Sequence, residues 1–225
     1  MKKYLILLLF SVGIAFSHDL WLEKKDNFYT LFYGHLNPSD NDQKSIEYNP
    51  NSVFEIKCFS QDGKEKSIKV ERSYPLKIFG KCDSVFIGFS SGYWTKTPYG
   101  LKNLPKNQVH MPLESWKSVE YVKRLDTDIN KPLTANLEIT PLDSIKNVKI
   151  GDKITFLVTL NAKPVKDTVV AYDEKPIGTT DDEGKINIRI KRSGIQNIST
   201  SLKLKEVSEK ADFTIYTSTL NFEVK

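Results

Sequence analysis

Short apolar runs separated by turn residues are the feature that most constrains the fold of this chain. The runs are rich in Val, Ile, Thr, Tyr and Phe, and 10 Pro and 11 Gly are spread along the sequence. β-branched and aromatic residues favour strands, whereas Gly and Pro interrupt regular elements. Ala-rich or Leu-rich segments with helical spacing are almost absent. We therefore expect an all-β protein of two β-sandwich domains, with the C-terminal one immunoglobulin-like.

The N-terminal half contains several predicted strands. Residues 27–35 alternate between two faces that are both apolar, which predicts a central strand. Further strands are expected at 53–59, 66–72 and 85–89. The aromatic stretch 90–108, with its Gly and Pro residues, predicts a long and functional loop. Residues 113–125 fit both a helical and a strand period, and we assign them to a strand.

The C-terminal half shows patterns of six or seven short strands spaced by turns, which is typical of an immunoglobulin-like sandwich. They cover residues 137–140, 153–160, 168–172, 185–190, 195–204 and 213–224. The polar stretch 126–134 is expected to link the two domains. The predicted organisation is a signal peptide over residues 1–17, an N-terminal β domain with the functional site over 18–133, and the sandwich over 134–225.

The first 17 residues predict export. Lys2 and Lys3 precede an apolar stretch over 4–16, and Ala15-Phe16-Ser17 has the small-x-small pattern of a cleavage site. No Cys follows the site to carry a lipid, and no later stretch is apolar enough to span a bilayer. We therefore expect a monomer in the periplasm, or otherwise outside the cytoplasm, without a lipid anchor.

The charge pattern of the predicted mature chain is balanced. Removing the two lysines of the signal lowers the formal net charge from +5 to +3, because that segment contains no acid. The remaining lysines are interleaved with Asp and Glu. This pattern indicates a solvated surface and gives no support to nucleic-acid binding.

Cys58 and Cys82 are the two cysteines of the chain. In an exported protein such a pair favours a disulfide, which would close a loop of about 25 residues and contribute about 3 to 4 kcal/mol. Two buried free thiols are the alternative. Two sulfurs alone make a weaker case for a metal site, since thiolate sites usually bring more cysteines together.

The three histidines are the candidate metal ligands. Cleavage after Ser17 makes His18 the first residue, whose α-amine and imidazole can chelate one metal ion. The ordinary pKa values of these groups are about 7.7 to 8.0 and about 6.5, so both lose their protons easily near neutral pH, as metal binding requires. His35 follows Tyr-Gly at the end of a predicted strand, and His110 follows the aromatic stretch. Nitrogen donors suit Cu(II) and Ni(II), while each histidine taken alone also fits a surface or packed role.

Motifs of common catalytic sites are missing from the sequence. It contains no Gly-x-Ser-x-Gly, Walker A, His-Glu-x-x-His or Gly-x-Gly-x-x-Gly pattern. We therefore expect a protein that is not an enzyme.

Several short motifs in order resemble the NikK-like periplasmic proteins that accompany nickel and cobalt uptake transporters. They are His-Asp-Leu-Trp-Leu-Glu at 18–23, Tyr-Gly-His at 33–35, the aromatic stretch at 91–100 and Thr-Leu-Asn-Phe-Glu-Val at 219–224. The resemblance implies an extracytoplasmic nickel-binding protein with two β domains that delivers metal to an energy-coupling-factor type transporter. It also implies that His18 and His35 are ligands, whereas His110 is added on position alone.

Three hypotheses follow for the function. The favoured one is Ni(II) binding and delivery to the membrane transporter, with Cu(II) or Co(II) as alternative metals. The second is a copper-binding protein or a copper monooxygenase, because an N-terminal histidine that braces copper with a second histidine is also the signature of that chemistry. The third is a structural or adhesive β-sandwich protein in which His18 has no special role.

Overall fold

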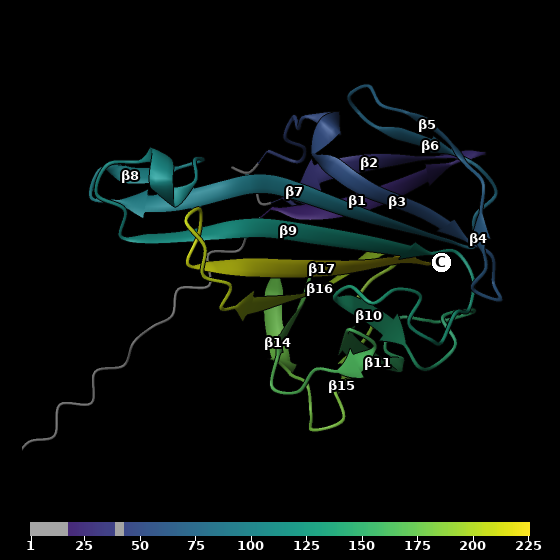
Figure 1. Cartoon of the computed structure of the whole chain (residues 1–225). Coiled ribbons are helices and arrows are strands. Elements are labelled where there is room, and N and C mark those ends of the chain that lie inside the picture. Colours follow the sequence, from purple (N-terminus) through teal and green to yellow (C-terminus); the bar gives the residue numbers. More distant parts are fainter. Residues whose placement is uncertain (1–17, 39–42) are drawn as a thin grey trace, which may run out of the picture.

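The computed structural model describes residues 18–38 and 43–225. The predicted signal peptide therefore lies outside the described residues. Strands form nearly the whole fold, and the helical elements of the described residues are two 3-10 turns, η1 (Pro50–Ser52) and η2 (Lys106–Gln108). The all-β prediction is confirmed (Figure 1).

A nine-stranded sheet forms the middle of the molecule. Its strand order is β14 (Lys175–Thr179), β13 (Val169–Tyr172), β16 (Gly194–Leu204), β17 (Phe213–Val224), β9 (Glu114–Leu125), β7 (Ser84–Thr97), β3 (Val53–Phe59) and β4 (Glu65–Lys66), and β8 (Gly100–Lys102) pairs with β7. Strands β17 and β9 run parallel, whereas the other pairs are antiparallel. The β9–β17 pair joins strands from both predicted domains in one sheet.

Two four-stranded sheets cover the central sheet. The first contains β1 (Asp19–Lys25), β2 (Phe28–Gly34), β6 (Lys77–Phe79) and β5 (Lys69–Glu71), and the second contains β10 (Glu138–Pro141), β11 (Lys153–Leu160), β12 (Lys163–Pro164) and β15 (Lys185–Arg189). Figure 1 shows them on opposite sides of β9 and β17. The neighbouring residues Tyr121 and Val122 of β9 belong to different apolar clusters, as the alternation of a strand requires. Each covering sheet thus forms a sandwich with the central sheet.

The predicted strands agree well with the structure in the C-terminal half, where all six are present. Strand β2 also lies between two neighbours, as its apolar faces predict. The prediction of a loop over 90–108 is wrong, because β7 continues to Thr97 and β8 pairs back onto it. A register shift between Phe89 and Gly92 explains the error, since it interrupts the alternation that reveals a strand.

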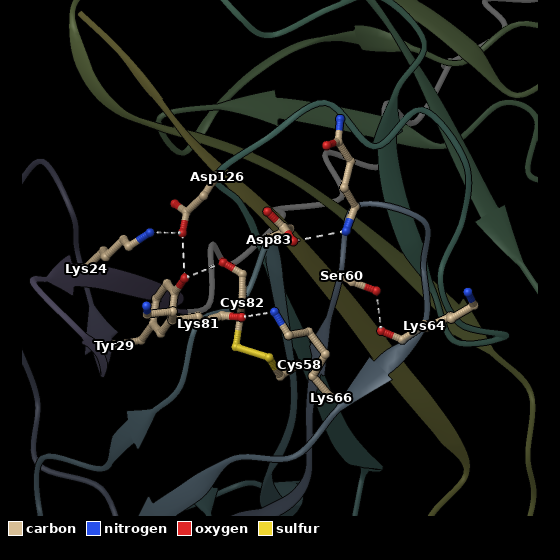
Figure 2. The surroundings of a disulfide bond; sticks show 11 residues. Lys24, Tyr29, Cys58, Ser60, Lys64, Lys66, Lys81, Cys82, Asp83 and Asp126 are labelled. Atoms are coloured by element: carbon tan, nitrogen blue, oxygen red, sulfur yellow. Dashed lines mark hydrogen bonds and ion pairs between the residues drawn. A yellow bond between two sulfur atoms is a disulfide. The ribbon is translucent and has the colours of Figure 1, made fainter.

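The predicted disulfide between Cys58 and Cys82 is confirmed (Figure 2). Their Cα atoms lie 5.3 Å apart, within the usual range for a disulfide. Both cysteines are buried, and the hydroxyl of Tyr29 donates to the Cys82 carbonyl at 3.0 Å. A disulfide of this kind is typical of oxidising compartments outside the cytoplasm. Among the described residues, no helix has the length and apolar character needed to cross a membrane.

Candidate functional site

His18 and His35 face each other across a β-hairpin. Strands β1 and β2 pair with Asp19 opposite Gly34, and they are joined by a two-residue turn, Asp26-Asn27. Continuing this register by one step places His18 opposite His35, and directly opposed residues project from the same face. The two imidazole rings accordingly lie with centroids 5.0 Å apart and planes at 66°.

Besides pairing with β1, the chain around His35 is hydrogen-bonded to residues 44–46. The amide of His35 donates to the Lys44 carbonyl at 2.9 Å, and the amide of Ile46 donates to the Tyr33 carbonyl at 2.7 Å. Gly34 lies between them with a φ of 140°, and a Cβ added there would lie 2.5 Å from the Lys44 oxygen. A glycine is therefore required immediately before His35 for this close approach.

Glu174 reaches His35 from the other half of the chain. The Nδ1 atom of His35 lies 3.0 and 2.9 Å from the two carboxylate oxygens of Glu174. Glu174 occupies the turn between β13 and β14 with Asp173, and both residues have positive φ, at 62° and 49°. Two-residue hairpin turns of this type require such values, which Asp and Gly tolerate best.

A second set of contacts fixes this turn. Both carboxylate oxygens of Asp173 accept from the guanidinium of Arg192, at 2.6 and 2.8 Å. Asp173 also accepts from the side-chain amide of Asn37 at 3.0 Å, and its backbone amide donates to the Asn197 carbonyl at 2.9 Å. The turn that carries Glu174 is thus held by Asn37, which follows β2, and by Arg192 and Asn197 of the second half of the chain.

Asp19, next to His18, is a buried acid. Its side chain accepts a hydrogen bond from the Asn197 amide at 2.6 Å, and the residue is 4% exposed. Burial, together with the nearby charge of Glu174, raises the pKa of Asp19 to about 7, although the hydrogen bond from Asn197 and the proximity of His35 act in the opposite direction. The surroundings of the two histidines therefore contain several acids and favour a cation.

His110 lies elsewhere. It is exposed and lies between η2 and β9. Three residues later, the amide of Leu113 donates to the Lys96 carbonyl of β7. Asp19, the neighbour of His18, lies near Glu120 of β9, since the charge of Asp19 contributes to the raised pKa of Glu120. Glu114, where β9 begins after the His110 segment, is six positions from Glu120 along the strand, or about 20 Å. The structure brings His18 and His35 together but does not bring His110 to them.

The described side chains alone do not complete a metal site. Within residues 18–38 and 43–225, no group of three or more His, Cys, Asp or Glu side chains is placed to hold one ion. The two imidazoles supply two nitrogen donors, and a third donor must come from elsewhere. If the chain begins at His18, its α-amine is an additional nitrogen donor on the same residue.

Residues 15–203 match the family described as "Domain of unknown function (DUF4198)". A protein of Haemophilus influenzae with the description "Uncharacterized protein" is 24% identical over 185 residues, which make up 78% of this chain and 77% of the relative. No solved structure matches the chain.

Proposed function

This chain belongs to the DUF4198 family, and we propose that it is an extracytoplasmic protein that binds a transition metal, Ni(II), and delivers it to a membrane uptake transporter. The observation that carries the proposal is the pairing of His18 with His35 across the β1–β2 hairpin, at 5.0 Å between ring centroids. The predicted cleavage after Ser17 would place the α-amine of His18 at the same point. The likeness to the NikK-like proteins supports the choice of metal and partner.

The proposed ligands are three nitrogen atoms from two residues. The amine and imidazole of His18 chelate the ion, and the imidazole of His35 closes the site. Glu174 accepts the Nδ1 proton of His35 in this arrangement, which leaves Nε2 as the donor to the metal. A carboxylate behind a ligating histidine fixes its tautomer and raises its basicity.

Three nitrogens leave open positions on a Ni(II), Cu(II) or Co(II) ion. The His18 and His35 residues are both half-buried, so one side of the site is open to a partner molecule. Such a site permits ligand exchange, which delivery to a transporter requires. Delivery itself needs no catalytic residue, in agreement with the absence of catalytic motifs from the sequence.

Copper chemistry is the second candidate function, because the same amine and two imidazoles are the ligands expected of a copper monooxygenase. Oxygen consumption by copper-loaded protein in the presence of a reductant and a polysaccharide would favour the enzyme. Tight nickel binding without oxygen consumption would favour delivery.

The test of the proposal is isothermal titration of protein that begins at His18 with Ni(II), Cu(II), Co(II) and Zn(II). An alanine placed before His18 keeps every side chain but separates the amine from its imidazole. We expect a loss of affinity of roughly a hundredfold, which corresponds to about 3 kcal/mol. His35→Ala is expected to weaken binding as well, whereas the matched variant His110→Ala leaves it unchanged.

Unchanged affinity of the extended variant would show that the amine is not a ligand. A protein that binds none of the four metals would overturn the proposal and favour a structural role. Intact-mass analysis of exported protein provides a separate check, because a start other than His18 removes the amine from the site.

A further inference from the structure

The end of the β7–β9 ladder farthest from Arg124 extends beyond the covering sheets. Figure 1 shows β8 at this end, apart from β1, β2 and the sandwich around β10 and β11. We define the β8 tip as residues 98–113, which follow β7, form β8 and η2, and end before β9. The tip is thus a projecting part of the molecule.

Large apolar side chains are exposed on the β8 tip. Half of the ten exposed large hydrophobic residues among the described part of the chain belong to it: Tyr99 at 77%, Leu101 at 52%, Leu104 at 43%, Met111 at 51% and Leu113 at 62%. Single exposed apolar residues are normal, but a concentration of this kind marks an interaction surface.

Lysines are the charged residues of the tip and the strand before it. Residues 84–113 contain Lys96, Lys102 and Lys106 and no Asp or Glu. Acids flank this stretch: Lys106 forms an ion pair with Asp212, and Glu114 lies opposite Lys96. Lys96 and Lys102 are exposed and lie on the paired strands β7 and β8, next to Leu101. Lys96 and Lys102 are therefore the exposed cations beside the apolar side chains.

Hydrogen bonds hold the tip in a defined shape. The hydroxyls of Thr95 and Thr97 donate to the carbonyls of Leu104 and Gly100, at 2.8 and 2.9 Å. The amide of Asn103 donates to the Tyr93 carbonyl at 2.9 Å. The apolar side chains are therefore presented by an ordered backbone, which reduces the entropy lost on binding.

We propose that the β8 tip binds the surface of a bilayer with anionic headgroups, with Lys96 and Lys102 contacting lipid phosphates while the apolar side chains of the tip enter the interface. Apolar groups with flanking lysines suit this boundary, because the charged heads stay at headgroup level and the side chains below them leave water. Because lysines are attracted to anionic lipids, the tip should prefer an anionic bilayer to a neutral one. This inference is independent of the metal that the histidine site binds.

The experiment is co-sedimentation of protein that begins at His18 with vesicles of phosphatidylglycerol and phosphatidylcholine, against vesicles of phosphatidylcholine alone. We expect binding to the anionic vesicles that decreases with added salt. Lys102→Glu should weaken partition at least fivefold, since each lysine near an anionic surface contributes about that factor. Leu101→Ser should weaken it roughly tenfold, through the loss of a buried apolar side chain.

The matched controls are Lys149→Glu and Ile150→Ser, in the loop before β11, where Ile150 is 60% exposed. Both are expected to leave partition unchanged. A second readout is an environment-sensitive fluorophore on Leu101→Cys, whose emission should shift to shorter wavelength with anionic vesicles, whereas the same label on Ile150→Cys should not respond.

Equal binding to both kinds of vesicle, no binding to either, or equal effects of tip and control variants would each overturn the proposal. Absence of vesicle binding would assign the apolar tip to a protein partner instead. Metal titration of the Lys102→Glu variant separates vesicle binding from metal binding, since its affinity for Ni(II) should equal that of the unchanged protein.

Discussion

The Nδ1 atom of His35 lies 2.9 Å from a carboxylate oxygen of Glu174, a residue 139 positions later in the chain. The contact joins the end of strand β2, in the first covering sheet, to the β13–β14 turn at the edge of the central sheet. Both side chains are partly shielded from water, at 18% and 25% exposure. The second half of the chain therefore sets the orientation and tautomer of a histidine in the first half.

Replacing Glu174 should weaken metal binding without removing a ligand. We expect Glu174→Ala to lower the affinity for Ni(II) by about ten- to a hundredfold, the usual effect of losing the carboxylate behind a ligating histidine. Glu174→Gln should restore part of the loss, because its amide oxygen still accepts from Nδ1. Isothermal titration measures both. Glu183→Ala, on an exposed turn, is the control, and an affinity loss as large as that of Glu174→Ala would show that the effect is not local.

Much of the fold follows from local patterns. The six C-terminal strands have β-branched and aromatic residues between turn residues, and these signals are strong in isolation. Strand β1 was not predicted, although its partner β2 was. The segment Leu20-Trp21-Leu22 has no polar alternation because one strand of a buried hairpin is apolar on both faces, as the burial of all three residues shows.

The sequence predicts only part of the candidate site. His18 and His35 are equidistant from the Asp26-Asn27 turn, so recognition of β1 and of this turn would have predicted their pairing. The contribution of Glu174 depends on how the two halves of the chain pack, which no local pattern contains. Local patterns also do not predict the single sheet that joins both halves, since the β9–β17 pairing connects segments far apart in sequence.

Loss of the disulfide should destabilise the protein without affecting the metal site. We expect the double variant Cys58→Ala, Cys82→Ala to lower the free energy of unfolding by about 3 to 4 kcal/mol, because the unfolded chain regains the conformations that the closed loop excludes. Urea denaturation gives the value, and titration with Ni(II) should show unchanged affinity. Stability equal to that of the oxidised protein would contradict the prediction.

The ion pair of Lys123 and Glu138 should be costly to break from one side. Both side chains are fully buried, with Nζ 2.8 Å from Oε1 and 2.9 Å from the Thr140 hydroxyl. Burial lowers the pKa of Lys123, although the charge of Glu138 opposes that effect. Lys123→Met leaves a buried carboxylate without its cation and should cost about 3 to 5 kcal/mol in the free energy of unfolding.

A second substitution provides the control for this pair. Glu138→Gln removes the buried negative charge and keeps one oxygen, which can accept from Leu133 N–H, the donor to Oε1, or from Thr134 N–H, the donor to Oε2. The double variant with Lys123→Met should therefore be more stable than Lys123→Met alone. If chemical denaturation shows that the losses in free energy of unfolding of the two single variants simply add in the double variant, the two side chains do not interact as a pair.

The last prediction concerns Glu120, a buried acid on β9 that is 3% exposed. Its Oε1 atom accepts from the hydroxyls of Ser118 and Ser91, at 3.1 and 3.2 Å. Burial raises the pKa of Glu120 from 4.5 to about 7, against the effect of these two hydrogen bonds and with a smaller contribution from the charge of Asp19. Between pH 4.5 and 7 the folded protein thus holds a proton that the unfolded chain releases.

The stability contributed by protonated Glu120 is therefore fully present below pH 4.5 and is lost as the pH rises to 7. Glu120→Gln removes this titration and should stabilise the protein at pH 8 by up to about 3 kcal/mol, at about 1.4 kcal/mol per unit of pKa shift, with little effect at pH 4.5. Urea denaturation across this range tests the difference. Glu114→Gln, on the same strand but 46% exposed at its side chain, should show no such trend. A constant difference between Glu120→Gln and the unchanged protein at every pH would mean that Glu120 stays ionised in the fold.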